Sequence, residues 1–166
     1  MIRALALIFA FASTALGDPL AVPFFHQQKN GCGAASVAMV AHYWTPATSP
    51  TPETVYNRLI DADRKGIQLA HMKSYMEEIG FQAFTLRGQW NDLEQHLAKG
   101  RPVIVSLQAG RAGRLHFAVL VGIEADHVWV NDPTRKAPHR TGRAKFQQQW
   151  DGANRWMLLA TPRATQ

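Results

Sequence analysis

The hydrophobic pattern of this chain changes period near residue 100, and this change restricts the fold more than any other feature. Before it, apolar residues recur mostly at helical spacing, and after it they run as in strands. Helices are predicted over 34–44, 52–62, 69–79 and 90–99, and strands over 81–86, 102–107, 116–123, 127–131 and 156–161. Helices followed by an antiparallel sheet are typical of an α+β domain.

Length and composition fit one such domain. The chain has 166 residues, of which 46% are hydrophobic, so it can build a substantial core. Cys32 is the single cysteine, which excludes a disulfide scaffold and a metal site made of several thiolates. We expect one domain over 18–166, preceded by a signal peptide over 1–17.

The first 17 residues have the pattern of a secretory signal. Arg3 supplies a positive start, the apolar run 4–12 is too short to span a bilayer as a stable helix, and small residues follow, with cleavage expected after Ala15 or Gly17. An uncleaved membrane anchor is the alternative. The prediction is an exported protein, periplasmic or secreted, with no stable membrane span after cleavage.

The chain is basic, with 18 Lys and Arg against 12 Asp and Glu. Its positive residues are scattered, and no aromatic-basic interleaving indicates a nucleic-acid module. We therefore expect no nucleic-acid partner and interpret the charge as a solvated surface, with an anionic partner as the lesser alternative. The densest basic group lies in a segment expected to be loop-like: Arg135, Lys136, Arg140, Arg143 and Lys145.

Cys32 stands between Gly31 and Gly33, directly before a predicted helix. A thiol there meets the positive end of the helix dipole and backbone N–H groups without helical partners, which favour the thiolate. The flanking glycines are expected to permit a sharp turn and the close approach of a substrate. The alternative is a buried cysteine that packs as a small hydrophobe. Export favours the reactive interpretation, because a lone thiol has no partner in its own chain.

A nucleophilic cysteine needs a base, and the base needs an orienting group. If three residues form the loop between the strands 116–123 and 127–131, Ile123 pairs with His127 and Ala118 pairs with Asp132. His116 is then a diagonal neighbour of Asp132 on one face, about 7–8 Å away. A two-residue loop would place the two on opposite faces.

The other histidines show no zinc-binding spacing, so neither a metal nor a cofactor is expected. Among them, His26 is harder to dismiss as a site residue, because it lies six residues before the cysteine.

Four segments resemble the C39 cysteine peptidases. Residues 22–27 with 31–40 resemble the nucleophile region, 100–105 the central strand, and 116–122 and 130–133 the histidine and aspartate blocks. The resemblance extends over nearly the whole expected mature chain and keeps the order Cys, His, Asp.

The resemblance implies a papain-like fold with Cys32 as nucleophile, His116 as general base and acid, and Asp132 as its orienting partner. It also implies a glutamine that helps to hold the oxyanion, for which Gln27 is the first choice and Gln28 the second. Transporter-linked members carry this glutamine six residues before the cysteine, where this chain has His26.

These features predict an exported thiol peptidase that cleaves a peptide or protein substrate through an acyl-enzyme. One alternative is an amidase that acts on cell-wall peptides with the same triad. Another is a degenerate domain that binds peptides without cutting them. Loops such as 45–52 and 108–114 are expected to shape the specificity pocket.

Overall fold

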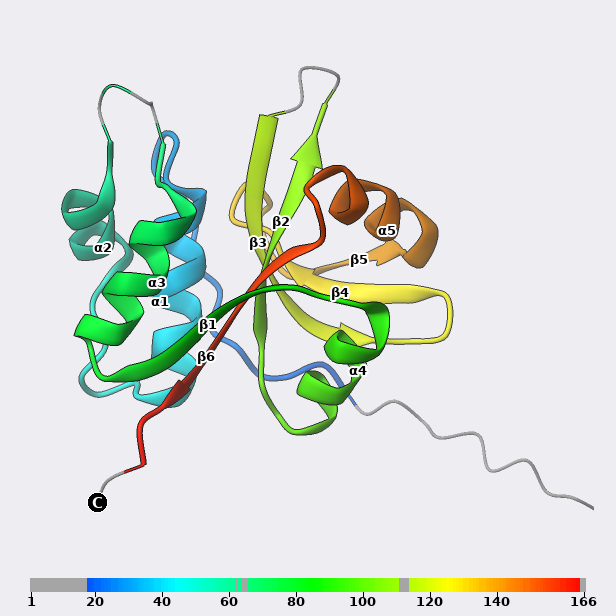
Figure 1. The fold of residues 1–166 in the computed structure, drawn as a ribbon, viewed down its shortest axis with the longest axis horizontal. Helices are drawn as coiled ribbons and strands as arrows, with labels where there is room; N and C mark the ends of the chain where they lie inside the picture. Colours follow the sequence, from blue (N-terminus) through cyan, green and yellow to red (C-terminus); the bar gives the residue numbers. More distant parts are fainter. Residues whose placement is uncertain (1–17, 62, 64–65, 111–113, 165–166) are drawn as a thin grey trace, which may run out of the picture.

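A computed structural model describes residues 18–61, 63, 66–110 and 114–164, and Figure 1 shows its helices around one sheet. The helices are α1 (Cys32–Trp44), α2 (Pro52–Leu59), α3 (Leu69–Glu78), α4 (Trp90–Ala98) and α5 (Arg143–Gly152). The strands are β1 (Phe81–Arg87), β2 (Val103–Ala109), β3 (Arg114–Ile123), β4 (His127–Asn131), β5 (His139–Gly142) and β6 (Trp156–Pro162). The strands lie in the order β1-β6-β2-β3-β4-β5, and each neighbouring pair is antiparallel. The predicted α+β class is confirmed.

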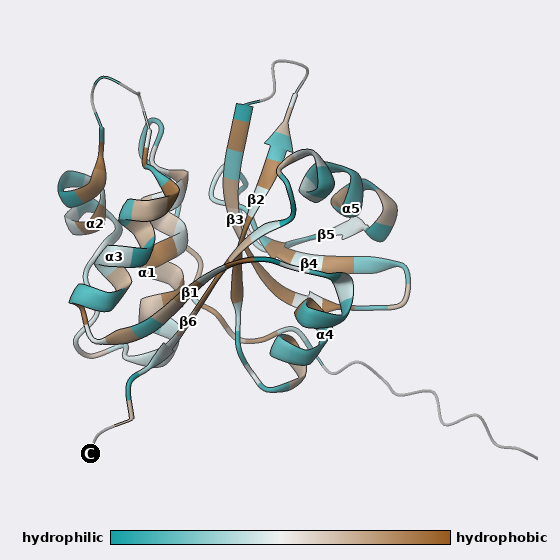
Figure 2. Ribbon diagram, viewed as in Figure 1, coloured by the Kyte–Doolittle hydropathy of each residue, from teal (hydrophilic) through white to brown (hydrophobic). Residues whose placement is uncertain are grey.

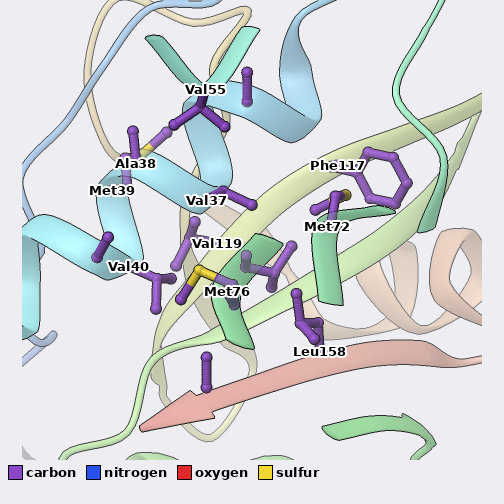
Figure 3. Close-up of a cluster of buried hydrophobic side chains, with 14 of the residues drawn as sticks. Val37, Ala38, Met39, Val40, Val55, Met72, Met76, Phe117, Val119 and Leu158 are labelled. Atoms are coloured by element: carbon purple, nitrogen blue, oxygen red, sulfur yellow. The ribbon is translucent and has the colours of Figure 1, made fainter. Parts of the chain in front are cut away.

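The sheet has a hydrophobic cluster on each face. On one face α1, α2 and α3 pack against strands β1, β2, β3 and β6 (Figure 3). On the other face α4 and α5 pack against β2, β3, β4 and β6. Alternate residues of β3 supply the two clusters, Val119 to the first and Leu120 to the second. Figure 2 shows hydrophobic residues along the strands and hydrophilic ones over much of α4 and α5.

Local signals set several helix ends. The side chain of Thr51 accepts a hydrogen bond from the Thr54 N–H, and Pro52 occupies the first position of α2. Gly80 and Gly100 follow α3 and α4 with φ values of 97° and 67°, which favour glycine. These three boundaries follow the sequence prediction, whereas α2 ends at Leu59, three residues before the predicted 62.

The segment after β4 differs from the prediction. The basic group expected in a loop contributes to strand β5 and helix α5, with Arg140 in the first and Arg143 and Lys145 in the second. Helix α5 forms because Phe146 and Trp150, one turn apart, are both buried against the sheet. The predicted loop 108–114 is also shorter, since β2 continues to Ala109 and β3 starts at Arg114.

The chain that precedes α1 is extended and runs along the sheet. The N–H of Leu20 donates to the Val121 carbonyl over 2.8 Å. The side chain of Asn131, 1% exposed, donates to the Val22 carbonyl over 3.1 Å. These bonds attach the segment before the cysteine to β3 and β4.

The predicted signal segment 1–17 lies outside the described residues. Within the described ranges, no helix combines the length and the apolar character needed to cross a membrane.

Candidate active site

Cys32 is the first residue of α1, which begins two residues before the predicted start at 34, and a tight turn presents it. The Gly31 N–H donates to the Gln28 carbonyl over 2.9 Å, and Asn30 takes the left-handed conformation with a φ of 61°. Gly31 itself has a φ of −100°, which other residues also adopt. The expectation that the glycines make the turn is therefore wrong, because the turn depends on Asn30.

The two glycines instead allow close packing. A Cβ on Gly31 would lie 3.0 Å from the ring of Tyr56. A Cβ on Gly33 would lie 3.1 Å from the Met72 sulfur and 3.2 Å from the side chain of Ile67. Both contacts are tight, so a side chain at either position would require the neighbouring side chains to shift by a few tenths of an ångström.

His116 and Asp132 are in direct contact. The Nε2 of His116 lies 2.7 Å from Oδ1 of Asp132, and the two side chains are only 15% and 16% exposed. The same carboxylate oxygen accepts hydrogen bonds from the Thr134 N–H over 2.9 Å and the Thr134 hydroxyl over 2.7 Å. Asp132 is thus fixed from two directions, and it fixes the plane of the imidazole.

A β-bulge brings these two residues to the same face. Near the hairpin loop Ile123 pairs with Val128, so the predicted pairing of Ile123 with His127 is wrong by one residue. The pairing shifts between Leu120 and Gly122, and beyond the bulge Val119 pairs with Asn131. That last pairing is the one expected for the site, and it leaves the predicted face of His116 and Asp132 unchanged.

The thiol and the imidazole also interact. Burial acts to raise the pKa of Cys32, but the hydrogen bond with His116 and those from the backbone N–H groups of Phe117 and Gly33 lower that pKa overall. Burial acts to lower the pKa of His116, yet Asp132 and Cys32 together raise it to about 9. Both shifts favour a thiolate beside an imidazolium over a neutral thiol beside a neutral imidazole.

The third group stays ionised. Burial acts to raise the pKa of Asp132, but hydrogen bonds from His116 and Thr134 hold that pKa well below its usual range. A thiolate next to an imidazolium that a carboxylate orients has the chemistry of nucleophilic attack followed by proton transfer.

Cys32, His116 and Asp132 line a cleft of about 1110 Å³. Gln27 lines the same cleft, its N–H donates to the Pro133 carbonyl over 3.2 Å, and its buried Oε1 has no hydrogen-bond partner among the described residues. Gln28 is exposed and does not line the cleft. The cleft thus contains the first-choice glutamine and not the second.

His26 does not line the cleft. It is exposed, and its ring packs against that of Phe24 at 5.1 Å. His26, the residue at the position where transporter-linked members carry the glutamine, thus lies outside the cleft.

Only one of the two loops expected to shape the specificity pocket lines the cleft. Ala109, Gly110 and Arg114 of the segment 108–114 line it, whereas no residue of 45–52 does. His139 of β5 and Lys145 of α5 also line the cleft, and neither was predicted to do so from the sequence. The spacing of Phe146 and Trp150 was the available signal for α5, and nothing local marked His139.

No group of three or more His, Cys, Asp or Glu side chains in the part of the chain that the structure describes is arranged to hold a metal ion.

Comparison with known proteins places the chain in a family. The model of the Peptidase_C39 like family matches residues 19–156. A protein of Pseudomonas fluorescens named "Probable functional amyloid protease FapD" is 30% identical over 128 residues, which are 73% of this chain and 53% of that protein. The protein of the same name from Pseudomonas aeruginosa is 29% identical over 126 residues, with the same coverage of both chains. The chain spans about half the length of these curated relatives.

Solved structures share the fold. A protein crystallised as a C39-like peptidase from Bacillus anthracis superposes with a TM-score of 0.67 at 18% identity, over 87% of this chain and 96% of that one. A double glycine motif protease from an AMS/PCAT transporter, solved with its leader peptide, superposes with a TM-score of 0.67 at 24% identity, over 87% and 94%. These likenesses bear out the papain-like architecture that the resemblance implied.

Proposed function

The chain belongs to the Peptidase_C39 like family, and from that premise we propose that it is a cysteine peptidase whose catalytic triad is Cys32, His116 and Asp132, with Gln27 at the oxyanion. The observation that supports this best is the position of His116. It hydrogen-bonds with the thiol of Cys32 on one side and with the Asp132 carboxylate, at 2.7 Å, on the other.

In the proposed mechanism the Cys32 thiolate attacks the carbonyl carbon of the scissile peptide bond. The oxyanion that forms accepts hydrogen bonds from the side chain of Gln27 and from the Cys32 N–H, which has no helical partner at the start of α1. The His116 imidazolium then gives its proton to the leaving amine, the C–N bond breaks, and a thioester remains.

Hydrolysis completes the cycle. Neutral His116 takes a proton from water, the hydroxide attacks the thioester carbonyl, and the C–S bond breaks to release the carboxylic acid and restore the thiolate–imidazolium pair. Asp132 keeps its charge throughout and stabilises the imidazolium. None of these steps requires a metal or a cofactor.

We propose a peptide or protein substrate, met outside the cytosol. The export pattern of residues 1–17 supports the second part of this proposal. The two Pseudomonas relatives are named as probable functional amyloid proteases, and one structural neighbour was solved with a leader peptide. An exported peptidase fits this range of peptide substrates.

Alkylation of Cys32 by iodoacetamide, followed against pH, tests the triad. Because Cys32 is the single cysteine, every modified molecule reports on this site. We expect the wild type to react rapidly well below pH 8, and His116→Ala to lose this reactivity and titrate near ~8.5 like a free thiol. His71→Ala, which changes an exposed histidine on α3 away from the cleft, is the matched control.

A wild type that titrates like His116→Ala would contradict the triad and favour a domain that binds peptides without cutting them. Intact-mass detection of a thioester after acid quenching tests the acyl-enzyme directly. Alkylation cannot separate a peptidase from an amidase, because both would use the same thiol. Parallel incubations with peptides and with cell-wall peptide fragments would separate them, because the two differ in substrate.

A further inference from the structure

The basic residues that follow β4, up to and including the first turn of α5, are of two kinds. Arg140 pairs with Glu124 and lies 5.7 Å from the centre of the Trp129 ring. Arg143 lies 4.0 Å from the centre of the Trp90 ring. Both are engaged in contacts that hold β5 and α5 to the rest of the domain.

Arg135 and Lys145 belong to the second kind. Both are exposed, both line the cleft, and neither has an ion-pair partner in the described ranges. Arg114, at the start of β3, shares all three properties. We call Arg114, Arg135 and Lys145 the basic wall.

His139 is under the electrostatic influence of Asp132 and of two members of the basic wall. Burial lowers the pKa of His139, Asp132 acts in the opposite direction, and the charges of Arg135 and Lys145 lower it further. Both cations are therefore close enough to act on a residue that lines the cleft beside Asp132.

The rest of the cleft does not neutralise the basic wall. Asp132 is the single carboxylate among its described lining residues, and its charge is already engaged by His116 and Thr134. Another part of the described lining, residues 66–70, contains Ile67 and Leu69 and has no charged residue. The described lining of the cleft thus has one basic part and one part that is apolar or neutral.

We propose that this cleft selects peptides whose acidic side chains face the basic wall while apolar side chains face residues 66–70. This inference rests on the proposed function, because it names the substrate class of the same site. Side chains of an extended peptide alternate between two sides, so one segment can satisfy both. The cations are exposed, so each ion pair contributes modestly and is screened by salt.

Binding separates this inference from catalysis. In Cys32→Ala, a fluorescein-labelled decapeptide that alternates leucine and glutamate is compared, by fluorescence anisotropy, with its leucine–glutamine counterpart. We expect the glutamate peptide to bind more tightly at 20 mM NaCl and to lose most of this advantage at 300 mM. Adding Arg135→Gln and Lys145→Gln should reduce the affinity ratio by about 2- to 30-fold, as two exposed ion pairs would.

The matched control adds Arg87→Gln and Lys99→Gln to Cys32→Ala. Both residues are exposed cations outside the cleft, so this variant has the same net charge and should keep the full affinity ratio. Equal affinities for the two peptides, or an equal loss of the ratio in the control, would overturn the inference.

Cleavage of a synthetic peptide pool by the active protein gives the second readout. We expect aspartate and glutamate to be enriched within about four residues of the cut bonds, because an extended peptide of that length can reach from the thiol to the basic wall. Cleavage with no such enrichment overturns the inference and leaves the proposed function intact. If the pool stays uncut while the glutamate peptide still binds Cys32→Ala more tightly, the proposed function fails and the charge preference stands.

Discussion

Asp132→Asn isolates the charge of the orienting group without removing its volume. The amide oxygen can still accept from the backbone and hydroxyl of Thr134, which hold the native oxygen at 2.9 and 2.7 Å. The contact with His116 changes from a charged hydrogen bond to a neutral one. The variant therefore tests whether the carboxylate is what keeps the imidazole protonated.

The expected size follows from that single contact. Hydrogen bonds to charged groups contribute about 1.5–3 kcal/mol and neutral ones about 0.5–1.5 kcal/mol, so the change weakens the bond by roughly 1–1.5 kcal/mol. One pKa unit corresponds to about 1.4 kcal/mol, so the pKa of His116 should fall from about 9 to ~8. Cys32 still favours the imidazolium, which keeps this pKa above the value of about 6.5 for a free histidine.

The assay is an NMR titration of the histidine ring protons, which needs no substrate. The chain has seven histidines, and the spectrum of His116→Ala identifies the resonance that belongs to His116. Asp151→Asn, an exposed carboxylate on α5 outside the cleft, is the matched control and should leave the pKa of His116 near 9. An unchanged pKa in Asp132→Asn would refute the assignment of Asp132 as the main support of the imidazolium.

Three further outcomes are expected in urea unfolding. Because the pKa of His116 is raised from 6.5 to about 9, its proton stabilises the folded protein fully below pH 6.5, and this stabilisation is lost as pH rises toward 9; His116→Gln should show a smaller loss over that range. Trp150→Ala should cost about 3–5 kcal/mol, since the ring is 2% exposed and donates to the Trp156 carbonyl; a cost below 1 kcal/mol would contradict its place in the core. Asn131→Leu should cost about 1–3 kcal/mol by leaving the Val22 carbonyl unpaired, and unchanged stability would mean that water replaces the amide.

The sequence predicted the helices and strands whose signals are local. Cys32 was recognisable because the start of α1 follows directly from an alanine-rich helical pattern. Strand β5 was not recognisable, because its four residues gain their order from pairing with β4 rather than from their own pattern. Helix α5 was missed because it is polar apart from its two buried aromatic residues.

The histidine–aspartate pair was predicted for a partly wrong reason. The expected pairing of Val119 with Asn131 is present, but the loop that was assumed to set it is one residue longer. The bulge beside Gly122 absorbs the extra residue, and no local pattern reveals a bulge because it exists only relative to the partner strand. The basic wall was out of reach for a similar reason, since it joins side chains from three separate elements.

The extended segment before α1 links the helix that bears the thiol to the strands that bear its base. It is hydrogen-bonded to β3 at Leu20 and to β4 at Val22, and it ends at the turn that presents Cys32. The segment packs closely against Gly122, where a Cβ would lie 3.1 Å from Pro19. The position of these hydrogen bonds bears on the proposed signal: a cut after Gly17 would keep both of them, whereas a cut beyond Val22 would remove both attachments of this segment to β3 and β4.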